Sequence, residues 1–119
     1  MAKWKWNDVE LDIDLEDADF VEKYEKAFNR MGETEKSVMS VGSLTERCKD
    51  YCKMFFQLFD DIFGNGTSDK LFKGKMHMGL VDECYESFLT FAKKEMEEAN
   101  KRRVARVTKL SKYAVKSKR

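Results

Sequence analysis

The sequence predicts a mainly α-helical fold: a small N-terminal β-hairpin packed on a helical domain, followed by a long basic C-terminal helix. The 119 residues include no proline, the residue that most often interrupts a helix. Apolar residues recur at helical spacing along most of the chain and alternate only near its start. A chain of this length, with 42% hydrophobic and 38% charged residues, is enough for one core.

Alternation from Lys3 to Leu15, with a change of phase at Asn7-Asp8, predicts two short strands joined by a two-residue turn. A hairpin this small is marginal alone, so we expect its apolar face to lie on helices. The two tryptophans also offer stacking platforms for single-stranded nucleic acid, but covering the core is the favoured interpretation. The apolar positions are Trp4, Trp6, Val9, Leu11, Ile13 and Leu15.

A first helix is predicted over residues 17–31, with Phe20, Tyr24, Phe28 and Met31 on its buried face. Gly32 is predicted to end this helix. Residues 33–42 are polar and weakly patterned, so both a helical continuation and a loop stay open for them.

A second helix is predicted to begin after Ser43, because Ser43 and Glu46 have the spacing of a capping box, and to stop at Gly64. A turn follows over residues 64–69, then one helical turn at 70–72 and a break at Gly74. This helix is expected to be the central one of the core. Its predicted apolar face consists of Leu44, Cys48, Tyr51, Cys52, Phe55, Leu58, Phe59 and Ile62.

The last helix is predicted to start near Gly79-Leu80 and to continue towards the end of the chain. From residue 80 to 112 it would span roughly 50 Å, whereas a small domain is about 30 Å across, so its end must project. We therefore divide the chain into a body, residues 1–100, and a basic tail, residues 101–119. The core positions expected on the body part of this helix are Leu80, Cys84, Phe88, Phe91, Ala92 and Met96.

The charge of the chain is strongly polarised although its net value is only +1. Nine of the 23 basic residues lie in the basic tail, which has none of the 22 acidic residues, so the body is net negative. A folded core has no need of such a division, because charges of either sign keep a surface solvated. We therefore expect the tail to contact a surface outside its own core, such as another molecule or another copy of the body.

The basic tail is also amphipathic, because Val104, Val107, Leu110, Ala114 and Val115 share one arc of the helix and most cations lie opposite. It has three interpretations: a solvated, disordered charge run, a helix that joins an oligomer or a partner protein, or a contact with nucleic acid or another anionic surface. The valines and the leucine favour the second. The predicted partner-binding residues are Arg103, Val104, Arg106, Val107, Lys109 and Leu110.

No catalytic residue, cofactor site or metal site is predicted, and we expect a protein that is not an enzyme. His77 is the single histidine, and the usual nucleophile, phosphate-binding and metalloprotease motifs are missing. Cys48, Cys52 and Cys84 could in principle join His77 around zinc, but their place in an apolar stripe favours free, buried thiols.

Residues 61–72 resemble a calcium loop only superficially, because phenylalanines stand at two of the ligand positions. Asp60 and Asp61 are instead expected to face solvent, with a smaller chance of meeting a basic partner such as the tail of another copy. The apolar runs are far shorter than the roughly 20 residues of a membrane span, and no signal peptide is evident, so a cytoplasmic location is expected.

Two segments resemble a known protein family. They are Val9-Glu10-Leu11-Asp12-Ile13 leading into residues 21–27, and residues 59–72 with Phe63-Gly64-Asn65-Gly66-Thr67 at their centre. They are similar to tail assembly chaperones encoded by phages and prophages of Gram-positive bacteria. The likeness covers roughly residues 8 to 100, and the basic tail departs from the pattern.

The resemblance implies a largely helical protein in the host bacterial cytoplasm that tends to form homo-oligomers. Its implied function is to bind helical segments of the tape-measure protein, to keep them soluble during tail assembly, and to help recruit the tail tube protein. Two alternatives stay open: a nucleic-acid-binding phage accessory protein that uses the basic helix, and a structural component of the virion.

Overall fold

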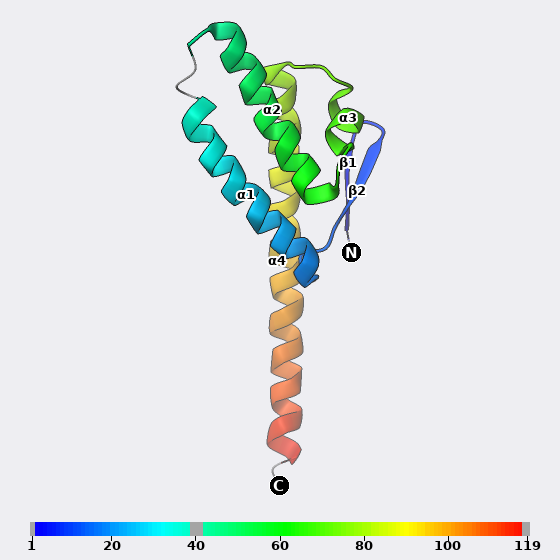
Figure 1. The fold of residues 1–119 in the computed structure, drawn as a ribbon. Helices are drawn as coiled ribbons and strands as arrows, with labels where there is room; N and C mark the ends of the chain where they lie inside the picture. The colour runs from blue at the N-terminus through cyan, green and yellow to red at the C-terminus, as the bar shows by residue number, and fades with distance from the viewer. Residues whose placement is uncertain (1, 39–41, 118–119) are drawn as a thin grey trace.

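The computed structural model describes residues 2–38 and 42–117, with side chains up to residue 113, and it confirms the mainly helical fold with an N-terminal hairpin. Helices α1 and α2 pack side by side, and α4 crosses behind them and continues beyond the body (Figure 1). The molecule measures 71 × 31 × 21 Å. The elements are β1 (Ala2–Trp6), β2 (Val9–Ile13), α1 (Ala18–Val38), α2 (Leu44–Phe63), α3 (Thr67–Phe72) and α4 (Met78–Ser117).

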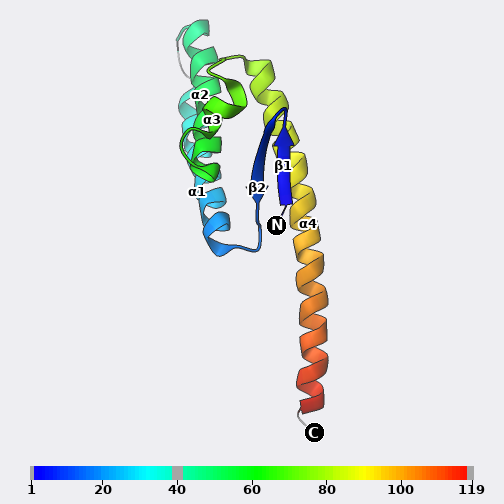
Figure 2. The same ribbon diagram turned by 90° about the vertical axis from the view of Figure 1, so that its right-hand side faces the viewer.

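The predicted hairpin is confirmed. Strands β1 and β2 pair antiparallel with Trp4 opposite Leu11, and Asn7 takes the positive φ of 54° that the turn requires. The hairpin lies alongside α4 (Figure 2). Trp4 is only 2% exposed, and its indole Nε1 donates a hydrogen bond of 3.1 Å to Ser87 of α4. Its burial confirms that Trp4 covers the core and leaves it no face for a nucleic-acid base.

The prediction that Gly32 ends the first helix was wrong, because α1 runs through it to Val38. A glycine inside a helix costs only about 1 kcal/mol and does not block the hydrogen bonds, unlike proline. Val38 is buried and anchors the additional turns against the core. The helical alternative for residues 33–38 is therefore the right one, whereas residues 39–41 lie outside the described part of the chain.

The predicted boundaries of α2 are confirmed. Ser43 accepts a hydrogen bond of 3.1 Å from the backbone N–H of Glu46, and Gly64 ends the helix at a φ of 112°. A short helix follows, as predicted, although α3 begins already at Thr67.

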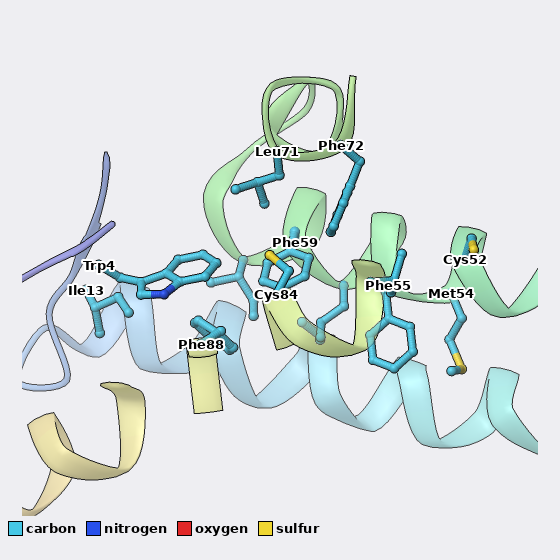
Figure 3. Close-up of a cluster of buried hydrophobic side chains, with 14 of the residues drawn as sticks. Trp4, Ile13, Cys52, Met54, Phe55, Phe59, Leu71, Phe72, Cys84 and Phe88 are labelled. Atoms are coloured by element: carbon cyan, nitrogen blue, oxygen red, sulfur yellow. The ribbon is translucent and has the colours of Figure 1, made fainter. Parts of the chain in front are cut away.

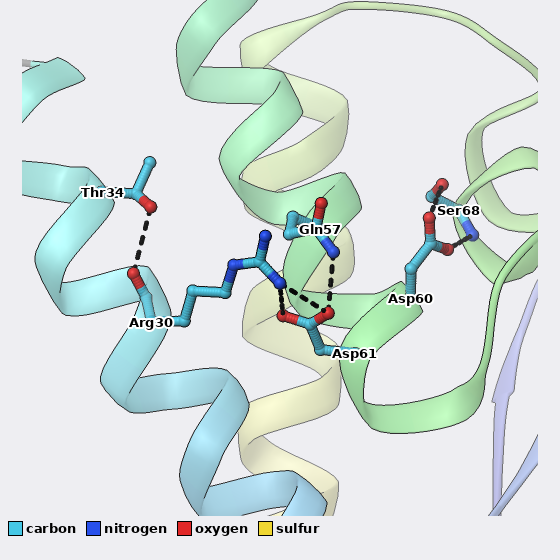
Figure 4. Close-up of polar contacts among 6 residues, drawn as sticks. All are labelled: Arg30, Thr34, Gln57, Asp60, Asp61 and Ser68. Atoms are coloured by element: carbon cyan, nitrogen blue, oxygen red, sulfur yellow. Dashed lines mark hydrogen bonds and ion pairs between the residues drawn. The ribbon is translucent and has the colours of Figure 1, made fainter.

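The two aspartates at the end of α2 do not face solvent freely, which corrects the prediction made for them (Figure 4). Asp60 accepts hydrogen bonds from the backbone N–H and the hydroxyl of Ser68, at 2.8 and 3.1 Å, and so holds the start of α3. Asp61 accepts one of 2.7 Å from Gln57 and pairs with Arg30 of α1 at 3.4 Å. Sequence spacing does not reveal the partners from other elements, Ser68 and Arg30, whereas Gln57 lies one turn before Asp61 on the same helix.

The core is a hydrophobic cluster rich in aromatic rings, to which every element contributes a buried residue (Figure 3). Phe88 of α4 is fully buried at its centre, stacks on Phe28 and meets Trp4 and Phe59 edge-on. Two predicted core residues were assigned wrongly. Leu44 is 77% exposed because it lies in the first turn of α2, and Met96 is 44% exposed because the body covers only part of α4 at that level.

Candidate partner-binding helix

Helix α4 is far longer than the body that it packs against. At 1.5 Å per residue, the span from Met78 to Ser117 is roughly 60 Å. Among its described side chains the last buried one is Ala99, and all those from Asn100 to Tyr113 are exposed. The predicted projection is therefore present, and it includes all six residues predicted to bind a partner.

Two arginines fasten α4 to the body where the projection begins. The guanidinium Nε of Arg102 donates a hydrogen bond of 2.9 Å to Glu16, in the segment between β2 and α1, and Arg103 lies 3.7 Å from the same carboxylate. The hydrogen bond from Arg102 lowers the pKa of Glu16 and raises that of Arg102. Arg103 thus has a partner within its own chain, a role that the sequence did not reveal because Glu16 lies more than eighty positions away.

The apolar stripe of the projection, which we define as Val104, Val107, Leu110 and Tyr113, is exposed to between 58% and 67%. Three of these residues were predicted, and Tyr113 was missed. Phe88, Ala99 and Leu110 follow one another at intervals of eleven residues, which is a rotation of only about 20° on a helix. Leu110 therefore lies on the face of α4 that buries Phe88 and Ala99, whereas Val107 and Val104 are turned by about 80° and about 140° from Ala99, so only part of the stripe continues the core face beyond the body.

The remaining predicted residues, Arg106 and Lys109, are exposed and form no ion pair with any residue that the structure describes. At 100° per residue, Lys109 lies about 160° from Val107, whereas Arg106 lies only about 40° from Leu110, beside the apolar stripe. The geometry brings all six predicted residues onto one projecting helix, on which cations flank an apolar stripe. Such a surface suits an amphipathic partner better than a small molecule.

The cysteines and the histidine do not converge on a common site. Cys52 and Cys84 are fully buried, and this burial raises their pKa values to about 11 and about 12, so their thiols stay protonated. His77 is exposed, and its Nδ1 accepts a hydrogen bond of 3.1 Å from the backbone N–H of Leu80 at the start of α4. Within residues 2–38 and 42–117, no three histidine, cysteine, aspartate or glutamate side chains form a metal-binding group.

A shallow hollow of about 630 Å³ lies between β1 and α4. Its charged lining includes Lys3, Lys5 and Lys94 together with Glu83 and Glu86, and the hollow is open to solvent on one side. These opposite charges mix along its walls and do not point at one centre. The hollow therefore gives no basis for a catalytic assignment.

A comparison with protein families matches residues 7–119 to a family of unknown function (DUF6673). The chain belongs to this family. The match runs through the whole basic tail, so the projecting helix is part of the family's sequence and not an addition to it. Comparisons with curated proteins and with solved structures gave no match. In the described part of the chain, no helix combines the length and the apolar character needed to cross a bilayer.

Proposed function

We propose that this protein is a non-enzymatic phage tail assembly chaperone that binds helical segments of the tape-measure protein and keeps them soluble in the host cytoplasm. The observation that carries the proposal is the exposed apolar stripe on a helix that projects from a well-packed body. The resemblance of residues 8–100 to tail assembly chaperones supplies the identity of the partner. Recruitment of the tail tube protein belongs to the same proposal.

The shape of the projection suits a helical partner. An apolar stripe of about three turns can accept the apolar face of another helix, with residues of one helix filling gaps between residues of the other. Arg106 and Lys109 would then meet acidic residues that flank the apolar face of the partner. A rigid helix loses little conformational entropy when it binds, which favours repeated, reversible capture.

Coexpression with a phage tape-measure protein tests this proposal. We expect the wild-type chain to increase the soluble fraction of the tape-measure protein, and Leu110→Asp to remove that effect, because it puts a charge in the centre of the apolar stripe. Ala105→Asp is the matched control, because it adds the same charge on the opposite side of the helix. Equal solubility with wild type and Leu110→Asp would contradict the proposal.

A nucleic-acid-binding accessory role is the second candidate, and the exposed cations Arg106, Lys109 and Lys112 favour it. Phosphate contacts release counterions, so this binding should weaken steeply as salt increases. Titration with labelled DNA and RNA at low and moderate salt separates the two roles. Absence of binding at low salt would dispose of the second one.

A further inference from the structure

The end of the body from which the projection leaves is acidic. We define the acidic rim as Glu16, Asp17, Asp19 and Glu22, which lie between β2 and the second turn of α1. The segment that leads into α1 reaches α4 where that helix leaves the body, through the ion pair between Glu16 and Arg102. Glu16 is engaged by Arg102 and Glu22 by Lys26, whereas the exposed carboxylate of Asp19 has no ion pair within the described chain.

The cations beyond Arg103 cannot neutralise the rim of their own body. Helix α4 is uninterrupted from Met78 to Ser117 and leads straight away from the rim. Lys112 lies ten residues beyond Arg102, or about 15 Å farther along the helix axis. A cationic projection and an acidic rim on one rigid molecule can therefore meet only between molecules.

We infer that the projection of one copy docks antiparallel on the projection of a second copy, with its basic end directed at the acidic rim of that copy. The two apolar stripes face each other across a twofold axis, and each replaces the solvent that now covers Val107 and Leu110 of the other.

Charge decides the direction of the pair. The two cationic projections lie along each other in either direction, but a parallel arrangement would also place the two acidic bodies side by side and leave each basic end far from an acidic rim. The antiparallel arrangement instead directs opposite charges towards each other at both ends. This inference goes beyond the proposed function and does not depend on the identity of the helical partner.

The size of the contact predicts a weak association. About three turns of helix from each copy bury less than the roughly 1,200 Å² of a stable interface. The dimer should therefore form and dissociate with protein concentration. It should also weaken with salt, because the charges that direct it are exposed.

Sedimentation of the full chain over a range of concentrations tests the association, at ionic strengths of about 10 mM and about 1 M. We expect a monomer–dimer equilibrium that shifts to monomer in high salt. Leu110→Asp should weaken dimerisation about tenfold or more, whereas Ala105→Asp should leave it within about twofold. Far-UV circular dichroism of both variants confirms that the helix is retained. Monomer at every concentration in low salt, or equal effects of the two substitutions, would overturn the inference.

Zero-length carbodiimide cross-linking tests the direction. In a mixture of isotope-labelled and unlabelled chains, the antiparallel dimer should give mixed-isotope cross-links between tail lysines and acidic residues at 16–22. These cross-links should disappear in high salt and in Leu110→Asp. Dimers that are cross-linked only between residues outside the rim would reject the antiparallel arrangement. The proposed chaperone function could still hold in that case, because its test measures solubility of a different protein.

Discussion

Replacing Trp4 by alanine should destabilise the whole protein and not only its hairpin. Trp4 is 2% exposed and stacks on Phe59 and Phe63, and its ring also meets Phe88 edge-on. A buried tryptophan removes 150–250 Å² from water, and at about 25 cal/mol per Å² this is worth roughly 4–6 kcal/mol. Because alanine keeps part of that burial, we expect a loss of about 3–5 kcal/mol in the free energy of unfolding. The midpoint of thermal unfolding should fall by roughly 10–20 °C.

Trp6 provides the matched control on the same strand. Its side chain is only partly buried, and its Nε1 is buried without a hydrogen-bond partner in the described structure. Replacing Trp6 by alanine also removes the free-energy cost of burying that unpaired donor. Trp6→Ala should therefore lower the free energy of unfolding by less than half as much as Trp4→Ala. Urea and thermal unfolding followed by the helical circular dichroism signal measure both variants. Equal losses for the two variants would refute the view that Trp4 is the anchor of the hairpin.

Three further predictions concern the body. Gly32→Ala should stabilise it by about 0.5–1 kcal/mol, because a methyl group at this helical position meets no neighbour. Gly64→Ala should destabilise it by about 1–3 kcal/mol, because Gly64 has a φ of 112° that alanine rarely adopts. The urea midpoints of unfolding measure both effects. Burial raises the pKa of Cys84 to about 12 and that of Tyr51 above its ordinary value, so the folded state keeps protons that the unfolded state loses. Stability should be constant up to about pH 9 and fall above it, and a flat urea midpoint up to pH 11 would contradict this. A thiol reagent should modify the partly exposed Cys48 at once and Cys84 only on unfolding; simultaneous reaction of both would oppose the assignment.

Local signals made most of the fold predictable. Ser43 and Gly64 set the ends of α2 through contacts within a few residues, and the sequence shows such contacts directly. The end predicted at Gly32 was wrong, because a glycine only weakens a helix, and tertiary contacts decide whether the helix continues. Burial of Val38 decides it here.

The projecting helix was predictable because helix length and the absence of glycine and proline can be counted. Its attachment was not, because the ion pair between Arg102 and Glu16 joins residues that are distant in sequence. The exposure of Met96 has the same origin: periodicity places it near the core face, but only the fold shows where the body stops covering α4.

Hydrogen–deuterium exchange along α4, with and without the tape-measure protein, tests the central claim most directly. In dilute protein alone, amides of residues 104–117 should exchange much faster than those around Phe88, because no packing protects the projection. Addition of the tape-measure protein should slow exchange in residues 104–117 about tenfold or more and leave the core unchanged. Protection confined to the body, with the projection unchanged, would contradict the assignment of this helix as the binding surface.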